Sequence, residues 1–264
     1  ILDGYPLAKQ GRAGEALMMA LKASTIGGII SAAALLLIAP QVARFALKFG
    51  PPEYFALAVF GLTVISSVGG KSPLKGLLAG MIGIMISTIG LDPIGGYDRM
   101  TFGVDRLAGG IDIIPAMIGL FAISEILEKV RTINHPIGEM IAYTKQKLPW
   151  STVAKKYGKT IVKSSLIGTF IGAVPGTGAA IASFLSYNEA KRVSKTPELF
   201  GTGHMDGVAA AEAGNNGVTG ATLIPLLTLG IPGDTVTAIM LGALMMQGIT
   251  PGPQLFAKQP ILVY

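Results

Sequence analysis

The sequence predicts an all-α, polytopic membrane protein, and three observations carry that prediction. Half of the 264 residues are hydrophobic, only 14% are charged, and the mean hydropathy is +0.58. Soluble domains carry about 25% charged residues. The apolar residues fall into long blocks, as membrane helices require. The 36 glycines and 16 prolines fit such helices, in which small residues permit close packing.

Composition also excludes several classes of function. The chain has no cysteine, which rules out disulfides and thiol chemistry. Its net charge of +6 does not indicate nucleic-acid binding, because aromatic residues are not interleaved with the basic ones. The basic residues stand between apolar blocks instead, as expected for loops beside a lipid bilayer. The chain begins at Ile1 and ends at Tyr264 after an apolar cluster, so we expect it to be a fragment of a longer protein.

The first part of the chain, residues 1–127, is expected to start in the cytoplasm and then cross the membrane about four times. Lys9, Arg12 and Lys22 precede the first span. The predicted spans cover residues 23–42, 54–70, 77–91 and 113–127, and a loop of mixed charge separates the last two. We interpret this part as the later portion of a first transmembrane repeat.

Residues 128–163 form a basic linker, which the positive-inside rule places in the cytoplasm. Within it, Trp150, Val153, Tyr157 and Ile161 recur at helical spacing. This pattern predicts an amphipathic helix, either lying on the membrane surface or exposed to water as a linker.

Residues 164–264 are expected to start a second repeat with a re-entrant helical hairpin at 164–190. Pro175, Gly176, Thr177 and Gly178 interrupt an apolar run there, and lysines flank both ends. Each arm is long enough to reach about the middle of a ~30 Å hydrocarbon core. The basic residues at both ends favour a hairpin whose arms return to one side, and the alternative is a single kinked span.

A broken span at residues 207–249 is predicted next. It contains Asn215 and Asn216, and it is interrupted near its middle by Gly230-Ile-Pro232-Gly233-Asp234. Non-helical backbone at membrane depth is tolerated only where it is buried or lines a cavity. Discontinuous helices with sites at the bilayer midplane are typical of secondary transporters.

Both breaks open a helix, and a helix start carries unpaired N–H groups and a partial positive charge. Two such starts meeting at the bilayer midplane would bind an anion without a buried lysine. The candidate substrate-binding residues are Pro175, Gly176, Thr177, Gly178, Asn215, Asn216, Pro232, Gly233, Asp234 and Thr235. Thr177 and Thr235 would add hydroxyl donors, and the asparagines would add amides that suit an anion or a sodium ion.

Asp234 allows two interpretations. It is either the N-cap of the following helix or, with Asn215, a ligand for sodium; a proton carrier is a variant of the second interpretation. Glu212 is open in the same way, as either a cavity residue or an interfacial one.

Three motifs resemble the large membrane subunit of the tripartite tricarboxylate transporters. They are Gly172-Ala-Val-Pro-Gly-Thr-Gly-Ala179, Gly207-Val-Ala-Ala-Ala-Glu-Ala-Gly-Asn-Asn216 and Leu223-Ile-Pro-Leu-Leu-Thr-Leu-Gly-Ile-Pro-Gly233. The segment Leu2–Gly14 is also similar, and the resemblance covers essentially the whole chain. Family members have two related halves, and this chain lacks the first hairpin and the first break. Leu2–Gly14 and Leu241–Gly252 look like counterparts of an inverted repeat, since each holds a Gln-Gly pair and only the first is basic.

The resemblance implies a permease rather than an enzyme, with no cofactor except a sodium ion or a proton as coupling ion. It implies secondary active transport, by symport, of citrate or related carboxylates across the bacterial inner membrane. It also implies two partners, a small four-span membrane subunit and a periplasmic solute-binding protein.

Two other functions are considered. An intramembrane aspartyl protease would use Asp98 and Asp234, but Asp98 lies in a polar loop and Pro232-Gly233-Asp234 lacks the first glycine of the protease motif. A non-transporting structural subunit would tolerate changes at Pro175, Gly176 or Gly233. A nucleotide-binding P-loop is excluded, because no Lys-Ser/Thr follows the glycines of residues 172–178.

Overall fold

The computed structural model describes residues 2–53, 55–56, 59, 73–92, 95–112, 115–116, 118–132 and 146–258. The chain divides into two compact units, which are described separately. The first comprises Ile1–Leu47, His135–Thr237 and Gly252–Tyr264, and the second comprises Lys48–Asn134 and Ala238–Pro251. The all-α prediction is confirmed in the described residues, where the strands are limited to two pairs of residues.

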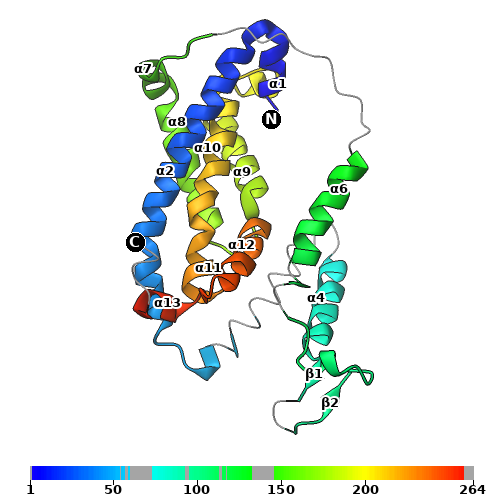
Figure 1. Cartoon of the computed structure of the whole chain (residues 1–264). Coiled ribbons are helices and arrows are strands. Elements are labelled where there is room, and N and C mark those ends of the chain that lie inside the picture. The colour runs from blue at the N-terminus through cyan, green and yellow to red at the C-terminus, as the bar shows by residue number, and fades with distance from the viewer. Residues whose placement is uncertain are drawn as a thin grey trace. The chain divides into compact units, whose positions relative to one another are not determined.

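A long N-terminal helix runs the length of the first unit. It consists of α1 (Gly4–Leu7), a π-helical turn (Ala8–Arg12) and α2 (Ala13–Ala46) (Figure 1). Gly11, with φ +76°, introduces a kink. Among the described residues, this is the helix that is both long and apolar enough to cross a membrane. It contains the span expected at residues 23–42.

The expected hairpin is present as two helices that fold back on each other. Strand-free chain from α7 (Trp150–Thr152) passes through a π-helical turn (Val153–Tyr157) into α8 (Gly158–Gly172). A short turn then leads into α9 (Gly178–Val193), which packs along α8. At the far end from the turn, Lys163 of α8 forms an ion pair with Glu189 of α9. The single kinked span is therefore wrong, whereas the entry of the hairpin into a membrane from one side stays a prediction.

The amphipathic helix of the linker exists, but its apolar face does not lie on a membrane surface or in water. Val153 and Ile161 are fully buried. They pack in one core with residues of α1, α2 and α10, including Leu7, Met19 and Val208. The spacing correctly indicated a buried face, and the protein itself covers it.

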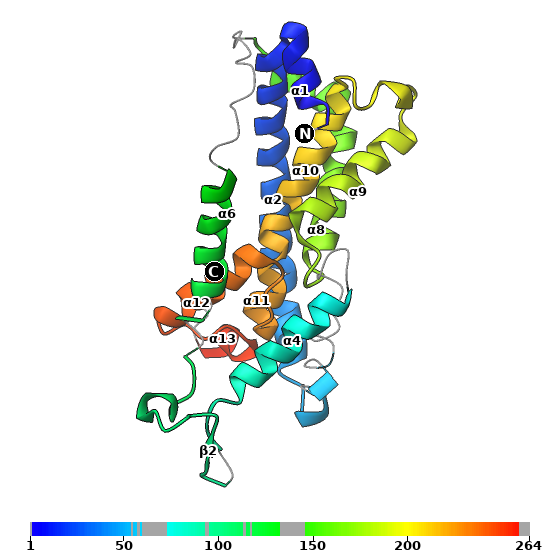
Figure 2. The ribbon, with the colours of Figure 1, turned by 90° about the vertical axis from the view of Figure 1, so that its right-hand side faces the viewer.

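The central helix of the first unit is α10 (Met205–Ala221), which packs against α2, α8 and α9 (Figure 2). Its glycines permit very close contact. A Cβ on Gly214 would lie 2.2 Å from Ser186 Oγ of α9, and a Cβ on Gly217 would lie 2.6 Å from the Ser165 carbonyl oxygen of α8. On the α2 side, a Cβ on Gly27 would lie 2.6 Å from the Ala213 carbonyl oxygen. Small residues thus allow three helices to approach the α10 backbone.

The predicted broken span corresponds to α10, α11 (Leu223–Leu229) and α12 (Thr235–Met246), and the chain continues into α13 (Pro253–Lys258). The interruption at residues 230–234 lies where the sequence placed it. A further bend separates α10 from α11 at Thr222, three residues before Pro225. Pro225 has no N–H for the helix and its ring crowds the preceding turn, which accounts for the bend.

The second unit contains α4 (Pro73–Ser87), β1 (Gly90–Leu91) paired antiparallel with β2 (Asp98–Arg99), a 3₁₀ turn (Asp105–Leu107), a π-helical turn (Ile118–Ile123) and α6 (Ser124–Thr132). Most of the span expected at residues 54–70 lies outside the described residues.

Two predicted boundaries in this unit are wrong. The helix expected to reach Leu91 ends at Ser87, because Gly90 takes φ +125° and begins the strand pair. The helix expected to end at Leu127 continues to Thr132, where good helix formers such as Lys129 and Arg131 follow without proline or glycine.

Candidate functional site

The first Pro-Gly break is a tight turn whose geometry requires glycine. Gly176 and Gly178 take φ +83° and +69°, a region that other residues rarely adopt. The Thr177 hydroxyl donates to the carbonyl oxygens of Ile171 (2.6 Å) and Val174 (2.9 Å). This hydroxyl therefore closes the turn, and it would have to leave these carbonyls in order to donate to a ligand.

The second break ends one helix and starts the next with paired caps. Gly230 takes φ +73°, and its N–H donates to the Leu226 carbonyl (2.9 Å). Asp234 caps α12: its Oδ1 accepts from the Thr237 N–H (2.8 Å), and the Asp234 N–H donates to Thr237 Oγ1 (2.8 Å). Such a reciprocal cap satisfies two donors that a helix start leaves unpaired. The N-cap interpretation of Asp234 is confirmed.

The two breaks touch each other through their backbones. The Gly176 N–H donates to the Gly233 carbonyl oxygen over 2.8 Å. Gly233 also lies against the bend of the α10–α11 helix, since a Cβ there would lie 2.8 Å from Thr222 Cβ. Two helix starts, at Gly178 and Thr235, therefore follow directly from one pair of hydrogen-bonded turns.

The neighbouring asparagines of α10 face different partners. Asn216 Nδ2 donates to Ser24 Oγ of α2 (2.8 Å) and to the Glu212 carbonyl oxygen (3.0 Å). Asn215 instead lines a cavity of about 290 Å³ between α9 and α10. The sequence proposed that both amides serve one site, but the structure does not bring them together.

That cavity starts beside the first turn of α9. Its lining is mostly apolar and comprises Leu2, Ala180, Ser183, Phe184, Tyr187, Ala211 and Asn215. The Ser183 hydroxyl is engaged by the Ala211 carbonyl (3.2 Å), which leaves the Asn215 amide as the polar group facing the space without a hydrogen bond to any described residue. Small-molecule cavities typically combine apolar walls with a few polar groups.

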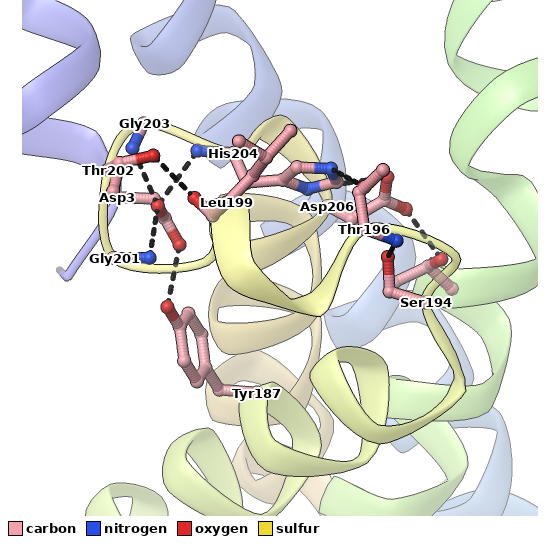
Figure 3. Close-up of polar contacts among 11 residues, drawn as sticks. Asp3, Tyr187, Ser194, Thr196, Leu199, Gly201, Thr202, Gly203, His204 and Asp206 are labelled. Atoms are coloured by element: carbon pink, nitrogen blue, oxygen red, sulfur yellow. Dashed lines mark hydrogen bonds and ion pairs between the residues drawn. The ribbon is translucent and has the colours of Figure 1, made fainter.

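Sequence reasoning missed a buried carboxylate near the N-terminus, Asp3 (Figure 3). Its Oδ1 accepts from the backbone N–H groups of Gly201, Gly203 and His204, each at 2.8 Å. Its Oδ2 accepts from the Tyr187 hydroxyl (2.8 Å). Asp3 is fully buried, so these four bonds replace its hydration. The loop Gly201-Thr-Gly203 is the one local sign of such a nest, and it does not identify the carboxylate.

Sequence reasoning also left open a polar cluster between α2 and α10. The Ser24 hydroxyl donates to Glu212 Oε2 (3.2 Å) and accepts from Asn216. In the described part of the chain, no group of three or more His, Cys, Asp or Glu residues is arranged to hold a metal ion.

Comparison with known proteins gives one family and two relatives. The model of the tripartite tricarboxylate transporter TctA family matches residues 1–264. An uncharacterized 52.8 kDa protein in the TAR-I ttuC' 3' region of Agrobacterium vitis is 38% identical over 265 residues, covering 100% of this chain and 52% of that protein. An uncharacterized protein in the TAR-II ttuC' 3' region of the same organism is 47% identical over 97 residues, covering 37% of this chain and 40% of that protein. The chain thus spans about half the length of the first relative. No solved structure matches it.

Proposed function

Because the chain belongs to the tripartite tricarboxylate transporter TctA family, we propose that it forms part of the permease subunit of an importer for tricarboxylates or related carboxylates. The family is a transporter family rather than an enzyme family. The observation that carries the proposal is the hydrogen bond from the Gly176 N–H to the Gly233 carbonyl, because it holds two helix starts at one place.

The proposed substrate cradle uses the helix starts of α9 and α12. Each start presents backbone N–H groups and a partial positive charge, which suit carboxylate oxygens. The proposed contacts are the residues of the two turns, Pro175 to Gly178 and Pro232 to Thr235, with Asn215 in the adjoining cavity. Asp234 would face the substrate only through its backbone, since its carboxylate caps α12. Asn216 contributes indirectly, through the cluster with Ser24.

The wider assembly is proposed from the family. The word tripartite in its description implies two further components. We propose a small four-span membrane subunit and a periplasmic solute-binding protein, working in the bacterial inner membrane. Import of citrate or a similar carboxylate would be coupled to an inward gradient of sodium ions or protons.

The other two functions are disfavoured on particular observations. An intramembrane aspartyl protease needs two aspartates that face each other, yet Asp98 is an exposed residue of β2 and Asp234 caps α12. A purely structural subunit gives no reason for two glycine turns to be joined by a hydrogen bond next to a cavity.

Uptake of radiolabelled citrate by the full-length transporter, with its partner proteins, in membrane vesicles tests the proposal. We expect Gly176→Leu to abolish uptake while the protein still inserts, because φ +83° at this position excludes a branched side chain. Gly4→Leu is the matched control, since Gly4 has open space where a side chain would begin. Normal uptake by Gly176→Leu would contradict the cradle and favour the structural role.

A further inference from the structure

Glu212 is a carboxylate in the packed face between α2 and α10. It lies seven residues into α10, about 10 Å from the start of that helix. The Ser24 hydroxyl donates to its Oε2 (3.2 Å), and Asn216 donates in turn to Ser24 Oγ (2.8 Å). Its neighbours Ala209 and Ala213 are fully buried in the core shared with α2. The carboxylate is therefore part-buried between helices, with one hydrogen-bond donor.

The charge of Glu212 has no partner in the protein. In the described residues, no Lys, Arg or His side chain forms an ion pair with it. The charged groups on the helices packed against α10 are engaged elsewhere: Lys22 of α2 donates to the Leu148 carbonyl and lies over the Trp150 ring, and Lys163 of α8 and Arg192 of α9 pair with Glu189. On α10 itself, Asp206 accepts from Thr160, and Tyr187 of α9 donates to Asp3.

An ionised carboxylate among packed helices is costly unless a positive charge neutralises it. In membrane helices such groups pair with one another or bind ions and protons. Asp234 does not need such a partner, because two donors from Thr237 already satisfy its Oδ1. Glu212 does.

We propose that Glu212, with Ser24 and Asn216, binds the monovalent cation that drives import, either sodium or a proton. This inference rests on the proposed transport function and adds to it the site of coupling. Carboxylate, hydroxyl and amide oxygens from two helices supply hard ligands for sodium, and the carboxylate alone suffices for a proton.

The site also has a route to the rest of the protein. Three residues along α2 from Ser24, Gly27 touches the α10 backbone, where a Cβ would lie 2.6 Å from the Ala213 carbonyl oxygen. The α2–α10 contact has no slack at this point, so neutralising Glu212 beside it alters how these two helices hold together. The same α10 leads through the Thr222 bend to the turn at Gly233.

The test uses the full-length transporter with its partner proteins, in vesicles, and two readouts. Accumulation of labelled citrate is measured under an inward sodium gradient and, separately, under an inward proton gradient. Exchange of internal unlabelled for external labelled citrate is measured with no gradient. Thermal unfolding of the purified protein in sodium chloride against choline chloride, over a range of pH, reports cation binding without transport.

We expect Glu212→Gln to lose about tenfold or more in gradient-driven accumulation but to keep most of its exchange, because the neutral side chain imitates the cation-bound state. It should also lose the cation-dependent rise in melting temperature. Glu198→Gln is the matched control, since Glu198 is exposed in a surface turn, and should behave as wild type. The gradient that drives the wild type identifies the cation as sodium or a proton.

Accumulation and a cation-dependent melting temperature equal to those of wild type in Glu212→Gln would overturn the proposal. Loss of exchange with an unchanged thermal response to cations would overturn it too. Should Glu212→Gln fail to fold, Ser24→Ala keeps the carboxylate and is expected to raise the cation concentration needed for half-maximal stabilisation severalfold; an unchanged value would refute the site. A wild type that transports no carboxylate but is stabilised by the cation through Glu212 would remove the proposed function and leave the cation site standing.

Discussion

The N–H of Gly176 donates a hydrogen bond to the carbonyl of Gly233, at 2.8 Å, and so joins two turns that are 57 residues apart in the sequence (233 − 176). Each turn ends one helix and is followed at once by another. Neither turn has a side chain at the point of contact, so the backbones meet directly. The contact therefore fixes where the helix starts of α9 and α12 lie relative to each other near Gly233.

Substitution of Gly233 by alanine should disturb this contact. The added Cβ would lie 2.8–2.9 Å from Cβ, Cα and the carbonyl oxygen of Thr222, so the backbone has to move. Overpacking of this kind costs about 1–3 kcal/mol of unfolding free energy. We expect a lower melting temperature and reduced citrate uptake in the full-length transporter.

The control for Gly233→Ala is Gly28→Ala in the long helix α2. A Cβ at Gly28 meets nothing within 4 Å, and alanine in a helix interior is favoured over glycine by roughly 0.5–1 kcal/mol. This variant should be as stable as wild type or slightly more so. Equal stability of the two variants would show that the close approach to Thr222 is not tight.

Replacement of Asp234 separates a helix cap from an ion ligand. Asp234→Asn keeps an oxygen that can accept from the Thr237 N–H, so it should retain stability, uptake and the response to the coupling cation. Asp234→Ala removes the cap and should cost about 1 kcal/mol. Thermal unfolding and citrate uptake of both variants check this, and a loss of cation dependence in Asp234→Asn would restore the sodium-ligand interpretation.

The helix boundaries at the two breaks could be predicted from the sequence because their signals are local. Glycines that take positive φ, and prolines that cannot continue a helix, fix the ends of α8 and α11 whatever surrounds them. The contact between Gly176 and Gly233 was expected only in outline, since a sequence shows that two breaks exist but not which backbone atoms meet.

The rest of the site depends on contacts between distant residues, which no local pattern encodes. Asn215 and Asn216 are adjacent, yet about 100° apart around a helix of 3.6 residues per turn, so they face different partners. The cluster of Glu212 with Ser24 joins two helices, and the nest around Asp3 joins residues nearly 200 positions apart. The strand pair at Gly90 and Asp98 was missed because two-residue strands carry no periodicity.

Removal of the Asp3 carboxylate should be the most damaging change near the N-terminus. Asp3→Ala would leave three backbone N–H groups and the Tyr187 hydroxyl without their acceptor. Each buried group left unsatisfied costs about 1–3 kcal/mol, so we expect a loss of about 3 kcal/mol or more. Tyr187→Phe removes one of the four bonds and should cost only about 1 kcal/mol.

The two changes should not be additive, because Tyr187 has lost its acceptor once Asp3 is alanine. Chemical unfolding of Asp3→Ala, Tyr187→Phe and the double variant measures this directly. A double variant that loses the full sum of the two single losses would indicate that Tyr187 acts independently of Asp3.

Burial of Ile161 distinguishes a core helix from one lying on a membrane surface. Ile161 is fully buried in the core with Leu7 and Met19, whereas the next residue, Val162, is 47% exposed. Ile161→Ala should therefore create a cavity and cost about 2–5 kcal/mol, while Val162→Ala should change the unfolding free energy by little. Thermal unfolding in detergent measures both, since detergent removes the bilayer but leaves the protein core. If the apolar face of this helix rested on lipid instead, the two variants would unfold alike in detergent, and the difference between them would appear only as weaker binding to vesicles.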